Sequence, residues 1–183
     1  MIYDPCDEYS RYQGWRDWMQ QLGNVPVIVS IDTHLKEANL WEAHVLKIAE
    51  GEKIWWRLRV QGDAEGPVRV VLSLEPYTIW QDWYATDAVT RSASFRWYQQ
   101  QGHIIQVQQQ IHHRIEPWDQ DLAARYLHRD SERQHQMTWQ TRHWASNESQ
   151  QIIEYAEIFW HPDRIVPPRN AITATYLVGG PHS

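Results

Sequence analysis

The sequence predicts an α+β fold, a mostly antiparallel sheet with helices packed on one side. Two pairs of alternating or β-branched runs lie close enough together to form hairpins, Ile54–Val60 with Val68–Leu74 and Gln136–Ala145 with Gln151–Trp160. Helical patterns separate the strand patterns, and no repeat, linker or low-complexity block divides the chain. The 183 residues therefore predict a single domain, 1–183, with its own core.

The first half of the chain is predicted to run helix, strand, helix, hairpin. Asp7–Leu22 carries aromatic and aliphatic side chains at helical spacing, and a Gly-Asn pair ends it. Val27–Ile31 is rich in β-branched residues and predicts a strand, whereas Glu37–Ile48 has an amphipathic helical pattern. In the hairpin that follows, residues 61–66 (QGDAEG) form the turn and Glu75-Pro76 ends the second strand.

The second half is predicted to continue with helices and strands around the second hairpin. Gly102 ends one helix and Pro117 breaks the strand that follows it. The expected elements outside the hairpin are a short helical turn within Tyr77–Thr90, a helix at Ser92–Gln101, a strand at His103–Ile115, a helix at Trp118–Leu127, a charged loop at His128–His135 and a last strand at Ile172–Val178.

Composition excludes several classes of protein. The formal net charge of -6, with only 17 lysines and arginines, argues against a surface that binds nucleic acid over most of the chain. No apolar run approaches the ~20 residues of a membrane span, and the polar N-terminus does not resemble a signal peptide. A single cysteine excludes an internal disulfide framework. We therefore expect a cytoplasmic protein.

Twelve tryptophans are unusual for a chain of this length. Aromatic side chains bury large areas and dominate either cores or interfaces. We expect most of them in the core, with a binding cleft or a subunit interface as the alternative.

Two arginines, Arg57 and Arg59, stand two residues apart in the first predicted hairpin. Alternation along a strand places both on one face, about 7 Å apart. Neighbouring guanidiniums repel, so acidic side chains, solvent or a bound anion such as phosphate or carboxylate must offset them. The alternative is an exposed face with cross-strand ion pairs.

Several short motifs, in order, resemble the UTRA domain, the effector-binding module of GntR-type transcription regulators of the histidine-utilisation-repressor branch, which shares the chorismate-lyase fold. The resemblance extends over about Tyr9 to Tyr176. It rests on five motifs. The first two are a helix ending in Gly (WMQQLGNVP) and a small helix with a Gly-Glu turn that leads into an R-L-R strand (EANLWEAHVLKIAEGEKIWWRLRV). The other three are a helix that begins with Ser (SFRWYQQQG), an A-x-x-L-like helix (DLAARYL) and a final strand (IIEYAEIFWHPDRI).

The sequence also departs from the family pattern. Phe95 and Trp97 replace the usual Leu and Tyr after the helix serine, and Trp160 stands where Tyr is common. Val71 and Leu72 occupy the region where sugar-binding members carry a carboxylate. The winged-helix DNA-binding domain of a complete regulator is not present in this sequence, so DNA contact would require that further domain.

The resemblance implies five ligand-binding residues. Arg57, Arg59 and Ser94 match the family's anion site, and Glu154 and Trp160 match the other end of its effector cleft. For Ser94 the alternative is helix capping alone. For Glu154 the alternative is an ion pair with Arg142 across the second hairpin.

The function that the resemblance implies is non-enzymatic sensing of a small anionic metabolite, without a cofactor. A chorismate-lyase-like enzyme and a stand-alone homodimeric interaction protein are the alternatives. A metal site is not expected, because the adjacent His112 and His113 point to opposite faces of a strand. We also expect a homodimer, with Ile172–Val178 or the second hairpin at the interface.

Overall fold

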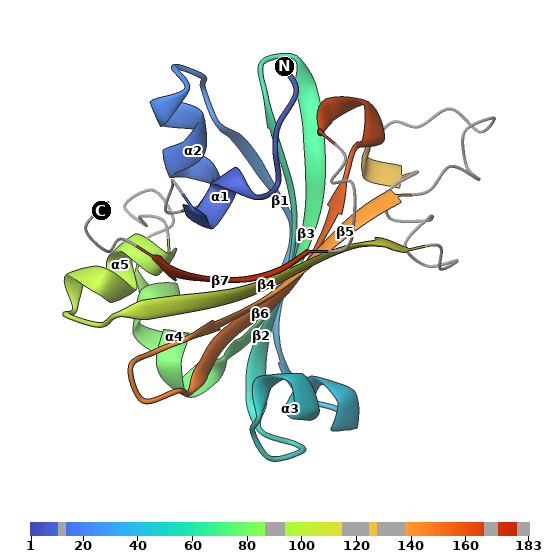
Figure 1. The fold of residues 1–183 in the computed structure, drawn as a ribbon. Helices are drawn as coiled ribbons and strands as arrows, with labels where there is room; N and C mark the ends of the chain where they lie inside the picture. The colour runs from blue at the N-terminus through green and yellow to red at the C-terminus, as the bar shows by residue number, and fades with distance from the viewer. Residues whose placement is uncertain (11–13, 87–93, 115–124, 128–137, 167–171, 179–183) are drawn as a thin grey trace.

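The computed structural model describes residues 1–10, 14–86, 94–114, 125–127, 138–166 and 172–178 (Figure 1). The strands of this part of the chain form one antiparallel, seven-stranded sheet in the order β1-β2-β3-β6-β5-β4-β7. Their bounds are β1 Val27–Glu37, β2 Lys53–Asp63, β3 Gly66–Pro76, β4 Ile105–Arg114, β5 Thr138–Ser146, β6 Ile152–Trp160 and β7 Ile172–Val178. The predicted α+β class is confirmed.

Both predicted hairpins form, and each has a local reason for its turn. In β2–β3 the pairing continues to Asp63 opposite Gly66, so the turn is shorter than the predicted 61–66. Gly62 permits this close approach, since a Cβ there would lie 2.2 Å from the Gly66 carbonyl oxygen. In β5–β6 the Asn147 side chain accepts hydrogen bonds from the backbone N–H of Ser149 and of Gln151, at 3.1 and 3.0 Å.

Strand β1 is longer than the predicted Val27–Ile31 and takes in residues expected in a loop. It pairs with β2 as far as Glu37, with a bulge between Ser30 and Asp32. The helix predicted at Glu37–Ile48 is correspondingly shorter, because a capping box at Asn39 fixes its start: Asn39 Oδ1 accepts from the Glu42 backbone N–H at 2.9 Å, and Glu42 Oε2 accepts from the Asn39 N–H at 3.0 Å.

The helices lie on both faces of the sheet. Their bounds are α1 Asp7–Ser10, α2 Trp15–Gln21, α3 Leu40–Leu46, α4 Tyr77–Ala85 and α5 Ser94–Gln100. Helices α1, α2, α4 and α5 gather on one face, whereas α3 packs on the other, against Leu74 and Tyr155, and lies apart from the rest in Figure 1. The expectation that helices cover one side therefore holds except for α3.

The opening helix is not continuous as predicted. It is replaced by α1 and α2, and Gly14, with φ of 108°, stands at the N-cap of α2. The predicted helix at Trp118–Leu127 and loop at His128–His135 lie almost entirely outside the described residues. None of the described helices is long and apolar enough to cross a membrane.

A tryptophan cluster joins α2 to the sheet around a buried arginine. Trp15 and Trp18 pack with Trp160 of β6, all three at most 3 % exposed. The Arg69 guanidinium lies between the rings of Trp15 and Trp160, 4.6 and 4.8 Å from their centroids. Arg69 also donates through Nη2 to Glu8 Oε1 at 2.6 Å, so an ion pair within the core fastens α1 to β3. These tryptophans belong to the core, as expected.

Replacing Glu8 by Gln should leave the Arg69 charge buried without its counter-ion. We expect the free energy of unfolding to fall by about 3–5 kcal/mol, measured by urea denaturation. The double variant Glu8→Gln/Arg69→Met should lose less than the sum of the two single variants, because it removes the uncompensated charge. A loss below about 1 kcal/mol for Glu8→Gln would contradict a buried ion pair, since it is typical of an exposed one.

Candidate functional site

A row of polar side chains crosses the middle of the sheet face that carries α1, α2, α4 and α5. The strand register places Arg57 opposite Ser73, Ser73 opposite Ala156, Ala156 opposite His143, and His143 opposite Gln109. Directly opposite side chains lie about 5 Å apart on one face. Five neighbouring strands thus contribute one residue each, and the small central Ala156 leaves room for the longer side chains on either side.

The first arginine of the R-L-R motif is held firmly in place. Arg57 Nη1 donates to Glu75 Oε1 at 2.8 Å, and the Tyr84 hydroxyl of α4 donates to the other Glu75 oxygen. The guanidinium also lies 5.0 Å from the centre of the Trp83 ring. Burial acts to lower the pKa of Arg57, but Glu75 outweighs it and raises this pKa above its ordinary value. Arg57 is therefore permanently charged, and its charge is paired with that of Glu75.

The second arginine is less well compensated. Arg59 Nη2 donates to Ser73 Oγ and lies 3.7 Å from Glu154 Oε1, while its buried Nε has no hydrogen-bond partner among the described residues. Burial, together with repulsion from Arg57, lowers the pKa of Arg59. Its side chain remains 14 % exposed. Arg59, which lies beside the row on the same face of β2, is thus the cation that an added anion would stabilise.

Two carboxylates of the site have pKa values shifted in opposite directions. Burial tends to raise the pKa of Glu154, but His143 and the two arginines outweigh it and hold this pKa below its ordinary value. Glu154 Oε1 accepts from Ser73 Oγ at 2.8 Å and lies 3.6 Å from His143 Nε2. Burial raises the pKa of Glu75, and the nearby Glu154 charge adds to this effect while Arg57 opposes it. Glu154 is therefore the carboxylate held ionised.

The structure shows the surroundings of the two arginines, and an anion contact stays a prediction. Arg57 and Arg59 share a strand face, as predicted, and the cross-strand ion pairs of the alternative are present. The two side chains are largely buried, however, at 11 and 14 % exposed. One of the balancing carboxylates is Glu75, which the sequence pattern indicated only as the end of a strand.

The alternative pairing of Glu154 is wrong. The register places Ala145, not Arg142, opposite Glu154. Arg142 instead lies opposite Glu157, and its Nε is 3.2 Å from Glu157 Oε1 on the other face of the sheet. Glu154 is therefore available to the polar row.

The two remaining predicted residues lie in different surroundings. Ser94 is the first residue of α5, and the ring of the next residue, Phe95, lies 6.3 Å from that of His143, so this helix begins beside the polar row. A ligand contact by Ser94 stays a prediction. Trp160 is fully buried in the tryptophan cluster, where Nε1 donates to Thr141 Oγ1 at 2.8 Å, so its surroundings are those of a core residue.

Residues that the sequence did not single out complete the site. His143 and Gln109 come from strands that were predicted, but strand order and register were needed to place them opposite Ala156 and each other. Ser73 could have been found from the sequence, because residues two apart on a strand share a face, and Ser73 and Glu75 therefore lie on one face of the second strand of the predicted hairpin. Within the described residues no group of three potential metal ligands comes together.

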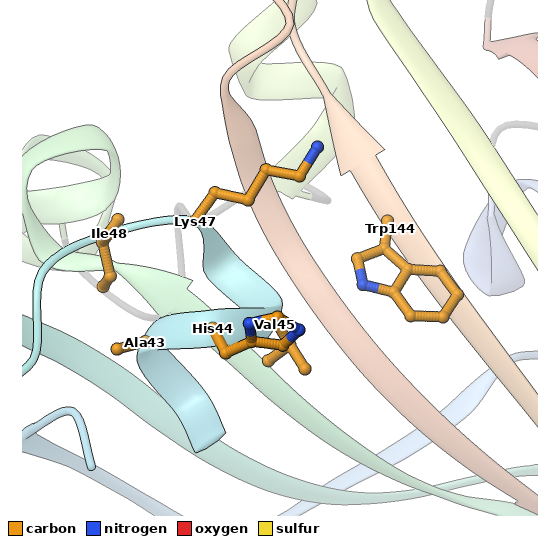
Figure 2. A pocket seen from close by; sticks show the side chains of 6 residues that line it. All are labelled: Ala43, His44, Val45, Lys47, Ile48 and Trp144. Atoms are coloured by element: carbon orange, nitrogen blue, oxygen red, sulfur yellow. The ribbon is translucent and has the colours of Figure 1, made fainter. Parts of the chain in front are cut away.

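A hollow of about 450 Å³ lies elsewhere, beside α3 on the opposite face (Figure 2). Its lining combines α3 and the following turn with Trp144 of β5, and its charged or titratable groups are Lys47 and His44. Figure 2 shows Trp144 across the opening from His44 and Val45. The polar row, with its buried charges of both signs, is the stronger candidate for recognition of a ligand.

No family model and no curated protein matches the chain. Solved structures do match. The effector domain of PhnF from Mycobacterium smegmatis superposes with a TM-score of 0.68 and 15% identity, over 81% of this chain and 88% of that one. PhnF itself matches over 86% of this chain and 69% of its own, at a TM-score of 0.68 and 13% identity.

A transcriptional regulator of the GntR family from Enterococcus faecalis V583 gives a similar result. Its TM-score is 0.64 at 14% identity, over 78% of this chain and 98% of that one. Likeness at such low identity is a likeness of fold. The chain therefore has the fold of the effector domains of GntR-family regulators, which confirms the architecture that the UTRA resemblance implied.

Proposed function

We propose that this chain is a small-molecule-sensing domain of a GntR-type bacterial transcription regulator. The ligand is an anionic metabolite bearing a phosphate or a carboxylate, and it binds at the polar row. The observation that carries the proposal is the state of Arg59, whose side chain is 14 % exposed and whose buried Nε lacks a hydrogen bond among the described residues. A planar guanidinium suits the paired oxygens of either anion.

The other end of the row supplies a different kind of contact. The buried Oε1 of Gln109 has no hydrogen-bond partner among the described residues, while its Nε2 donates to the Pro5 carbonyl at 3.2 Å. An oriented acceptor of this kind suits a ligand hydroxyl or amine. Gln109 lies four strands from Arg59, about 19 Å at the usual strand spacing, so we assign the anion contact to Arg59 alone.

Regulation would follow from the context of such a domain. The proposed regulator works in the cytoplasm and reads DNA through a winged-helix domain outside this chain. Ligand binding would change the geometry of a dimer and so the spacing of two attached DNA-binding domains. The PhnF comparison supports this reading, because this chain matches an effector domain over most of both chains.

The lyase alternative is disfavoured by the electrostatics of Glu154. An enzyme that cleaves a carboxylated ring would need an acid to protonate the leaving fragment, and Glu154 was the candidate. Its lowered pKa makes it a poor proton donor at neutral pH. We accordingly propose a non-enzymatic role. Turnover of chorismate by the unaltered protein, lost in a Glu154→Gln variant, would overturn this proposal.

Replacing Arg59 by Met should weaken binding of inorganic phosphate or sulfate at least tenfold in calorimetry, because the charge-assisted hydrogen bonds to the anion are lost. Folding should change little, since Arg59 makes the less complete ion pair of the two arginines. Arg57→Met is a poor test, because it leaves the buried Glu75 carboxylate without a counter-ion, which lowers the free energy of unfolding by about 3 kcal/mol.

The matched control is Arg96→Met on α5, where the side chain is 44 % exposed and Nη2 lies 3.5 Å from Asp17 Oδ1. We expect this variant to bind the anion as the unaltered protein does. Equal affinity in Arg59→Met and in Arg96→Met would show that the anion binds elsewhere.

Stability should depend on Glu154 in acid. Because its pKa in the folded protein lies below the ordinary 4.5, the ionised carboxylate stabilises the fold above that pH, and the contribution is lost as the pH falls below it. Glu154→Gln should therefore be less stable than the unaltered protein at neutral pH, and the difference should shrink between about pH 5 and about pH 2 in urea unfolding, as the pH falls toward the folded-state pKa of about 2. A difference that stays constant over this range would refute the ion-pair role of Glu154.

A further inference from the structure

The hollow beside α3 is a second candidate site, on the face of the sheet opposite to the polar row (Figure 2). Its volume of about 450 Å³ is in the usual range of sites for small ligands. Four of its lining side chains are apolar or aromatic: Ala43, Val45, Ile48 and Trp144. The others are His44 and Lys47, and no carboxylate joins them among the described residues. The hollow therefore combines apolar walls with a positive charge, although the chain as a whole has a net charge of -6.

The tryptophan wall of the hollow is held in place by a buried neighbour. Trp144 is only partly buried, and its ring centroid lies 5.2 Å from that of Tyr155. Tyr155 is 2 % exposed, and its hydroxyl donates to Glu157 Oε1 at 2.7 Å. A wall that is already ordered loses little entropy when a ligand arrives. Because aromatic rings pack well against one another, the Trp144 indole suits a flat, apolar ring.

Lys47 occupies a backbone position that glycine usually fills. At the end of α3 the Lys47 N–H donates to the His44 carbonyl at 3.3 Å. The Ile48 N–H donates to the Ala43 carbonyl at 3.1 Å, and the two bonds together form a Schellman motif, whose left-handed residue is most often glycine. Lys47 has a φ of 55°, where a side chain is disfavoured relative to glycine. Ending the helix does not require a lysine here, which points to a role for its side chain.

The charge of Lys47 is available to a ligand. Lys36 Nζ donates to Glu42 Oε1 at 2.9 Å, whereas Lys47 has no carboxylate partner in the part of the chain that the structure describes. The Lys47 side chain is exposed, and Figure 2 shows it extending from the end of α3 toward the strand that carries Trp144. A lysine ammonium is a compact donor that attracts carboxylate oxygens. The hollow therefore offers an anion contact beside an apolar space.

We propose that this hollow binds a planar aromatic carboxylate, with its ring beside Trp144 and its carboxylate at Lys47. Such a ring buries apolar surface, which a small hydrated anion such as phosphate lacks. Lys47 favours the carboxylate over a neutral or cationic derivative of the same ring. The volume is sufficient for one or two fused rings. The site lies on the other face of the sheet from Arg59 and goes beyond the proposed sensing of an anion there.

Replacing Lys47 by Gly separates binding from folding. The variant loses the ammonium group, so its dissociation constant for naphthalene-2-carboxylate should rise at least tenfold in calorimetry. Glycine fits the left-handed backbone better than lysine, so the variant should melt at the same temperature as its parent or higher. The parent in all titrations is the Arg59→Met variant, because the proposed anion site at Arg59 would also take a carboxylate.

The matched control is Gln150→Gly. Gln150 also has a left-handed backbone, with a φ of 61°, but it stands in the turn between β5 and β6 and does not line the hollow. This variant should melt no lower than the parent. It should bind naphthalene-2-carboxylate within about twofold of the parent's affinity, because a change outside the site acts independently of it.

A second test changes the charge of the ligand. The cation 2-naphthylmethylammonium has the same ring system, and it should bind the parent at least tenfold more weakly than the carboxylate does. Lys47→Glu should reverse this order, because a carboxylate then replaces the ammonium beside the apolar walls. Trp144→Leu keeps an apolar wall but removes the indole, so it should weaken the binding of both ligands. Circular dichroism checks that these variants fold.

Either of two results would overturn the proposal. One is the absence of calorimetric binding of naphthalene-2-carboxylate at millimolar concentration, and the other is equal affinity in Lys47→Gly and in Gln150→Gly. Neither result bears on the anion site, because that site is tested with inorganic phosphate or sulfate in the presence and in the absence of Arg59. The two proposals can therefore fail separately.

Discussion

Two guanidiniums side by side on one buried strand face are the constraint around which the middle of this sheet is built. Arg57 and Arg59 cannot both remain charged there unless nearby groups offset their repulsion. Glu75 on β3 and Glu154 on β6 do so from neighbouring strands, and Tyr84 of α4 occupies the remaining oxygen of Glu75. The charge of Arg57 is more fully compensated by its carboxylate partner than the charge of Arg59, so Arg59 is the one of the two that an anion would stabilise.

The strands and hairpins were predictable because their side chains are half-buried and alternate. The same reasoning placed Arg57 and Arg59 on one face without any structure. It failed at Asp32–Glu37, which pairs with β2 although its side chains are mostly exposed. An edge strand is held by backbone hydrogen bonds to one neighbour, so its side chains need not carry the pattern by which strands are found.

The composition of the site depended on register, which the sequence did not determine. A shift between Gln61 and Gly62 moves the partners of β2 by one residue, so counting back from the turn misplaces the residue opposite Arg57. The second hairpin also has an irregularity, between Ala145 and Ser146, which accounts for one of the three positions by which the expected partner of Glu154, Arg142, differs from the observed Ala145. Side chains one residue out of register lie on opposite faces.

The strand order also determines when the site can exist during folding. Arg57, Arg59 and Ser73 belong to a hairpin that closes locally, but the hydrogen bond from Ser73 to Glu154 spans 81 residues of sequence. Contacts of such separation form at a high entropic cost and slow the folding of sheet proteins. Either hairpin alone would carry only part of the charge balance. The site is thus a property of the joined halves, and a chain divided between β3 and β6 would lose it until the two fragments reassociated.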